Sequence, residues 1–119
     1  MLLVEDDDGV RDLARLILST DGFQVLVARD GNEAIAVAER HPGPIHVLVS
    51  AAILPKMSGR QVALQLWRRR QDTKVLFLIC SINEMISPQD VHYPDIAFLQ
   101  KPFTPASLLQ KVREVLAKP

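Results

Sequence analysis

Short apolar runs alternate along the chain with segments in which apolar residues recur every three or four positions. The runs lie at residues 2–4, 23–28, 45–49, 75–79 and 96–99, and each has the length of a β-strand. Strands in which nearly every residue is apolar are typical of parallel sheets that helices cover on both faces. The pattern therefore predicts an α/β fold with a doubly wound, five-stranded parallel sheet.

The segments between the runs predict amphipathic helices with recognisable ends. Asp21 and Gly22 end the first helix, and Thr104 opens the last. Asp30 with Glu33 resembles a capping box and opens the second. The apolar stripes of the first and last helices are expected to lie in the core: Val10, Leu13, Ala14, Ile17 and Leu18, then Leu108, Leu109, Val112 and Leu116.

The chain is less regular around residues 82–94, where Pro88 and Pro94 limit any helix to a turn or two. Before this region, a loop leads to a third helix that carries Val62 and Leu66 on one side, with Trp67. We expect Trp67 to be partly buried by packing.

Length and composition favour one globular domain over residues 1–119. Hydrophobic residues make up 48% of the chain and charged residues 24%, which argues against disorder. The formal net charge is zero, so we expect no binding to nucleic acid or membranes by this chain itself. The single cysteine, Cys80, fits a reducing, cytoplasmic compartment. Apolar segments close to both ends suggest a domain taken from a larger protein.

Polar side chains stand where the predicted strands end. Glu5 and Asp6 follow the first strand, and Lys101 follows the fifth. The carboxyl ends of parallel strands form the usual working edge of such a sheet, so these side chains are expected to converge. Paired carboxylates suit Mg²⁺, and a lysine opposite them can neutralise a phosphate or the acids themselves.

The chain resembles a response-regulator receiver domain of two-component signalling over essentially its full length. Residues 3–6 (Leu-Val-Glu-Asp), 54–59 (Leu-Pro-Lys-Met-Ser-Gly) and 101–103 (Lys-Pro-Phe) carry the resemblance, in the right order and spacing. The sequence of residues 98–105 most resembles that of receivers in hybrid histidine kinases. The resemblance implies a flavodoxin-like sheet with strand order 2-1-3-4-5.

In this family an acid pair and an aspartate after the third strand hold Mg²⁺, and that aspartate accepts a phosphoryl group from a kinase histidine. A Ser or Thr after the fourth strand and a Lys after the fifth contact the phosphoryl oxygens. The resemblance assigns the acid pair to Glu5 and Asp6 and the lysine to Lys101. It also implies that the bond between Lys101 and Pro102 is often cis.

Two positions depart from the family pattern. The acceptor position, four residues before Pro55, holds Ala51, and the hydroxyl position holds Ile79. The aromatic switch position holds Phe98, which keeps a ring without a hydroxyl. Ser50 adjoins Ala51, but successive side chains of a strand point to opposite faces, so we do not expect it to substitute.

Other polar residues have plain structural interpretations. Asp7 and Asp8 are expected to be solvated or to cap a helix, and Cys80 to be a small buried filler. The histidines show no metal-ligand spacing, and the arginine run is expected to be a solvated helix end. These residues are His41, His46 and His92, and Arg68, Arg69 and Arg70.

The sequence favours a degenerate receiver that is not an enzyme, requires no cofactor, and binds Mg²⁺ weakly or not at all. Its expected partners are a histidine kinase, a phosphotransfer protein, or a neighbouring receiver or output domain. The alternative is an ordinary phosphorylated receiver whose aspartate was changed to Ala51 by mutation. A third hypothesis, a flavodoxin-like or nucleotide-using enzyme, lacks a Gly-rich loop after the first strand.

Overall fold

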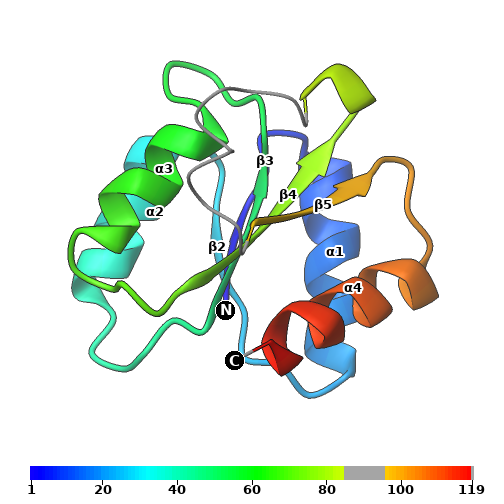
Figure 1. Ribbon diagram of the computed structural model, residues 1–119, viewed down its shortest axis with the longest axis horizontal. Helices are drawn as coiled ribbons and strands as arrows, with labels where there is room; N and C mark the ends of the chain where they lie inside the picture. Colours follow the sequence, from blue (N-terminus) through cyan, green and yellow to red (C-terminus); the bar gives the residue numbers. More distant parts are fainter. Residues whose placement is uncertain (85–95, 119) are drawn as a thin grey trace.

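The computed structural model describes residues 1–84 and 96–118, and in this part of the chain five parallel strands form one sheet (Figure 1). The strand order is β2-β1-β3-β4-β5, so the predicted fold class and order are confirmed. The strands are β1 (Leu2–Val4), β2 (Leu26–Ala28), β3 (Val47–Ala51), β4 (Lys74–Ile79) and β5 (Ile96–Gln100). The helices are α1 (Asp8–Thr20), α2 (Gly31–Arg40), α3 (Gly59–Trp67) and α4 (Pro105–Ala117), with a 3₁₀ turn η1 (Ile82–Glu84).

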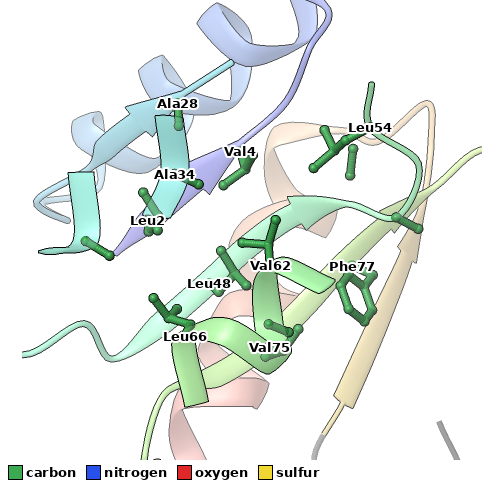
Figure 2. Packing of buried hydrophobic residues seen from close by; sticks show 14 of the residues in the cluster. Leu2, Val4, Ala28, Ala34, Leu48, Leu54, Val62, Leu66, Val75 and Phe77 are labelled. Carbon is green, nitrogen blue, oxygen red and sulfur yellow. The ribbon is translucent and has the colours of Figure 1, made fainter. Parts of the chain in front are cut away.

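Helices cover both faces of the sheet, with α2 and α3 on one side and α1 and α4 on the other (Figure 1). Two buried clusters fill the spaces between these layers. Figure 2 shows the cluster under α3, where Val62 and Leu66 lie against the sheet residues Leu48, Val75 and Phe77. None of the helices within residues 1–84 and 96–118 is long and apolar enough to cross a membrane.

The ends of α1 follow from local chemistry, but its expected stripe is partly wrong. Asp7 caps the helix by accepting a hydrogen bond from the backbone N–H of Val10 at 3.0 Å. Gly22 ends it with a φ of 96°, a conformation that favours glycine. Leu13, expected in the core, is 47% exposed. Ala14 faces the sheet, and one residue turns a helix by about 100°, which places Leu13 at the margin of the buried face.

The capping box predicted for α2 is half formed. Asp30 accepts from the backbone N–H of Glu33 at 2.8 Å, as expected. The carboxylate of Glu33 instead accepts from the backbone N–H of Arg29, at 3.1 Å. At the last helix, Thr104 and Ser107 make the reciprocal pair of bonds, so the predicted cap is confirmed.

Strand limits differ from the apolar runs by a few residues. The second strand is shorter than residues 23–28, because pairing with β1 covers Leu26–Ala28 alone. The third strand begins two residues later than expected and extends to Ala51. Most of the irregular region at residues 82–94, with Pro88 and Pro94, lies outside the described residues.

Arg70 is not a solvated helix end, so that prediction is wrong for this residue. Its guanidinium donates to the carbonyl oxygens of Ala38 (3.0 Å), His41 (2.8 Å) and Gly43 (2.7 Å). These carbonyls lie at and beyond the end of α2, where helix carbonyl groups have no partner within the helix. Arg70 therefore ties the chain after α3 to the end of α2, whereas Arg68 is exposed as expected.

Trp67 is half-buried, as predicted, and its indole N–H donates to the carbonyl oxygen of Thr73 at 2.7 Å. The hydroxyl of Thr73 in turn donates to the carbonyl oxygen of Ile45 at 2.7 Å. These bonds fix the turn between α3 and β4.

Candidate functional site

The carboxyl ends of the strands meet at one edge of the sheet, as the sequence predicts. Val4 of β1 pairs with Ser50 of β3, so the next residues, Glu5 and Ala51, lie at the same level of the sheet. The backbone N–H of Lys101 donates to the carbonyl oxygen of Ile79 at 2.7 Å, which brings the ends of β4 and β5 together. The switch in strand order between β1 and β3 lies at the same edge.

Glu5 and Lys101 form a largely buried ion pair at this edge. The Nζ of Lys101 donates to Oε1 of Glu5 at 2.8 Å, and 18% and 1% of the two side chains are exposed. The second carboxylate oxygen of Glu5, Oε2, accepts from the backbone N–H of Asp7 at 3.1 Å. Both carboxylate oxygens therefore have partners within the chain. The expected convergence of Glu5 and Lys101 is confirmed.

Two opposing effects act on the ammonium of Lys101. Burial lowers the pKa of Lys101, because a charged group is less stable away from water. The hydrogen bond to Glu5 and its negative charge raise it, with smaller contributions from Cys80 and Asp6. The net result is a pKa above the usual value for lysine, so Lys101 is a cation at neutral pH.

The other acids of this loop do not join the pair. Asp6 is exposed. Asp7 caps α1, and Asp8 forms an ion pair with Arg11, so their structural interpretation is confirmed. The guanidinium of Arg11 also donates to the carbonyl oxygen of Glu5 at 2.9 Å, which secures the turn between β1 and α1.

Among the described residues, no three His, Cys, Asp or Glu side chains are grouped so that they could hold a metal ion. His41 is half-buried and His46 is exposed, whereas His92 lies outside the described residues.

Ala51 is the last residue of β3, and 2% of it is exposed. The start of α3 packs closely on it: a Cβ added to Gly59 would lie 2.3 Å from the carbonyl oxygen of Ala51. Glycine is therefore required at residue 59 for this approach. The hydroxyl of Ser50 is buried and donates to the carbonyl oxygen of Ala51 at 2.9 Å.

The chain between β3 and α3 makes a tight turn at Lys56. This residue has a φ of 67°, in the left-handed region that non-glycine residues seldom adopt. The backbone N–H of Met57 donates to the carbonyl oxygen of Pro55 at 2.7 Å across it, which is the hydrogen bond of a γ-turn. The turn brings the chain back towards the sheet just before Gly59.

Ile79 and Phe98 belong to apolar surroundings. Ile79 is 1% exposed and lies in the core cluster beneath α3. Phe98 is half-buried against the same cluster, with its ring centroid 5.9 Å from that of Phe77. The peptide bond between Lys101 and Pro102 is cis, as the resemblance implies.

Cys80 is exposed, so the prediction of a buried filler is wrong. The buried pattern of β4 ends at Ile79, and Cys80 is the first residue beyond it. Its backbone N–H donates to Oε2 of Glu84 at 2.9 Å, and that of Ser81 donates to the same oxygen at 2.8 Å.

Sequence reasoning missed Glu84 and Arg60, whose guanidinium donates to the carbonyl oxygen of Glu84 at 2.9 Å. Ser81 and Glu84 have the spacing of a capping box, and this signal predicts the bond from the backbone N–H of Ser81 to the Glu84 carboxylate but not the one from Cys80. No sequence pattern predicts the contact with Arg60, which spans 24 residues.

Comparisons with known proteins agree with this geometry. The sequence profile of the family described as "Response regulator receiver domain" matches residues 1–113. The sensor kinase CckA of Brucella abortus (strain 2308) is 31% identical over 121 residues, covering 99% of this chain and 12% of that protein. The response regulator MprA of Mycobacterium avium (strain 104) is 33% identical over 121 residues, covering 99% of this chain and 51% of that protein. This chain therefore spans about half the length of MprA and far less of CckA.

Solved structures give the same result. The receiver domain of the hybrid histidine kinase CckA has a TM-score of 0.74 and 31% identity, covering 97% of this chain and 96% of that one. The chemotaxis protein CheY4 of Vibrio cholerae has a TM-score of 0.80 and 28% identity, covering 96% of this chain and 95% of that one. The fold, the residues at the carboxyl ends of the strands and the matched family profile all agree. The chain therefore belongs to the response regulator receiver domain family of two-component signalling.

Proposed function

We propose that this domain is a pseudo-receiver, which works through protein–protein contacts and does not accept a phosphoryl group. The observation that carries the proposal is Ala51, at the buried end of β3 where the family resemblance places the acceptor. A methyl group offers no nucleophile and no metal ligand. Ile79 supports the proposal, because its buried side chain cannot hydrogen-bond a phosphoryl oxygen.

The state of the acid pair also supports this function. Mg²⁺ prefers several oxygen ligands in octahedral geometry and gives up its water reluctantly. Both carboxylate oxygens of Glu5 already accept hydrogen bonds, and Lys101 is a competing cation 2.8 Å from one of them. Asp6 is exposed and is the remaining acid of the expected pair. A metal ion here would have to compete with Lys101 for Glu5, so we propose that Mg²⁺ binds weakly at most and that no cofactor is required.

The proposed partners are a histidine kinase, a phosphotransfer protein, or a neighbouring receiver or output domain. Receiver domains of two-component systems interact with the first two classes. We also propose that the chain is one domain of a longer protein, because the relatives that it matches extend well beyond the matched region.

An ordinary receiver whose aspartate was changed by mutation is the second candidate. It is favoured by the retained Glu5, Asp6 and Lys101, which are the residues that such a receiver would need. The native coding sequence at codon 51 separates the two candidates directly.

The proposed function is tested by treating the chain with acetyl phosphate and Mg²⁺ and measuring its intact mass. We expect no added phosphate, whereas the matched variant Ala51→Asp is expected to gain one. A phosphate on the unaltered chain, at any position, would contradict the proposal.

A further inference from the structure

Glu84 closes the short loop of residues 80–84, directly after β4, by means of three hydrogen bonds. Oε2 of its carboxylate accepts from the backbone N–H groups of Cys80 (2.9 Å) and Ser81 (2.8 Å). Its own backbone N–H donates to the carbonyl oxygen of Ser81 at 3.0 Å. Hydrogen bonds to a charged carboxylate are stronger than those between neutral groups, so this loop has a defined shape without any ligand.

A fourth bond joins this loop to another element. The guanidinium of Arg60, in the first turn of α3, donates to the carbonyl oxygen of Glu84 at 2.9 Å. Arg60 follows Gly59, which packs directly on the carbonyl group of Ala51. We call Arg60 and Glu84 together the loop clasp. It connects the chain that follows β3 with the chain that follows β4.

We propose that the loop clasp is a conformational lock, which fixes residues 80–84 in one arrangement and couples them to the start of α3 without a phosphoryl group. In a phosphorylated receiver, the phosphoryl group would bridge the ends of these same two strands. Here Arg60 and Glu84 connect them without a ligand. The role as a substitute for phosphorylation rests on the proposed function, whereas the lock itself rests on the four hydrogen bonds.

The two residues have separable parts in this lock. Glu84 shapes the loop through its carboxylate, and Arg60 binds the shaped loop to α3 through a backbone oxygen. The bonds of Glu84 without Arg60 would order residues 80–84 locally and leave them independent of α3. A partner that moves this loop must therefore displace the guanidinium of Arg60.

The test is amide hydrogen exchange, followed residue by residue at Cys80 and Ser81. In Glu84→Ala we expect both amides to exchange at least about tenfold faster, because they lose a charged acceptor. In Arg60→Met we expect the same amides to exchange several-fold faster, although their own acceptor remains. Matched controls are Arg68→Met, an exposed arginine after the same helix, and Glu114→Ala, an exposed glutamate on α4. Both controls should stay within about twofold of the unaltered chain.

Cys80 provides a second measurement, because it is the single cysteine of the chain and is exposed. Its alkylation rate should change in Glu84→Ala and Arg60→Met and stay constant in the two controls. Arg60→Lys keeps a donor and should give exchange rates between those of Arg60→Met and the unaltered chain, which covers the case that Arg60→Met does not fold.

Two results would overturn the lock. If the amides exchange equally fast in Arg60→Met and Arg68→Met, Glu84 orders its loop only locally and Arg60 has no part in it. If exchange in Glu84→Ala is unchanged, the loop clasp does not exist. Phosphorylation of the unaltered chain is measured separately. If the chain is phosphorylated and the exchange results are as expected, the pseudo-receiver proposal is wrong and the conformational lock is still supported.

Discussion

The ammonium of Lys101 lies 2.8 Å from Oε1 of Glu5, a residue 96 positions away in the sequence. Only 1% of the Glu5 side chain is exposed to solvent. This pair connects the first and last strand ends of the candidate site. Each residue of the pair therefore has a structural role in the fold, whatever chemistry the site performs.

Replacing Lys101 should therefore affect stability. In Lys101→Met the charge of Glu5 stays buried without its cation, which should lower the free energy of unfolding by about 1–3 kcal/mol. The double variant Glu5→Gln/Lys101→Met removes both charges and should recover part of that loss. Chemical denaturation of the three variants checks this. An unchanged midpoint for Lys101→Met would mean that the pair contributes nothing to folding.

The same pair predicts a loss of stability at high pH. The pKa of Lys101 is raised above 10.5 in the folded chain, so its contribution is fully present below 10.5. The contribution is lost as the pH rises through the higher pKa of the folded state. The difference in unfolding free energy between the unaltered chain and Lys101→Met should be constant up to pH 10.5 and narrow above it. A difference that already narrows well below pH 10.5 would contradict the raised pKa.

Without any substitution, Mg²⁺ should bind weakly or not at all, because the ion has to compete with Lys101 for Glu5. Calorimetric titration should show no saturation below about 1 mM Mg²⁺. Lys101→Met, which removes the competing cation, is the informative comparison and should bind the ion more tightly. Clear saturation of the unaltered chain in the micromolar range would refute the prediction.

Ala51→Asp should restore Mg²⁺ binding and slow phosphoryl acceptance, without full switching. The new carboxylate would supply both a nucleophile and a metal ligand, and phosphoryl transfer depends mainly on positioning and charge neutralisation. Ile79 still offers no hydroxyl. The experiment compares Ala51→Asp with Ala51→Asp/Ile79→Thr by phosphorylation and backbone chemical shifts.

Two outcomes would count against this account. If Ala51→Asp takes no phosphate and binds no Mg²⁺, residue 51 is not at the site. If it switches as fully as the double variant, Ile79 is not an obstacle.

Arg70 should be important for stability although it is remote from the candidate site. Arg70→Met leaves three carbonyl groups near the end of α2 without their donor and should cost about 2 kcal/mol or more. Arg70→Lys should recover only part of this cost, since an ammonium lacks the planar fork of donors with which the guanidinium binds the three oxygens. Arg68→Met is the control, and thermal unfolding of the three variants should separate them. Equal melting temperatures for Arg70→Met and Arg68→Met would show that these bonds are not needed.

The sequence predicts what depends on periodicity and strand order. The apolar runs define the sheet, and the rule that parallel strands end at one edge brings Glu5 and Lys101 together before any coordinates are known. It fails where a single position lies at a boundary: Leu13 at the margin of a helix face and Cys80 one residue beyond a strand.

The sequence also fails for long polar side chains that bind backbone oxygens far along the chain. Arg60 and Arg70 both do this, and such contacts depend on how two elements pack, which no local pattern records. Arg70 therefore cannot be told from a surface arginine by its neighbours in the sequence.

The opposite charges of Glu5 and Lys101 cancel within their ion pair, and this has a consequence for what a partner can detect at this edge of the sheet. Phosphorylation adds close to two negative charges to a protein surface, and a partner can distinguish the modified form from the unmodified one. Under the proposed function, this edge of the sheet keeps one electrostatic character at all times. A partner that binds this edge would then meet no change in charge, and it would have to recognise the shape of the domain alone.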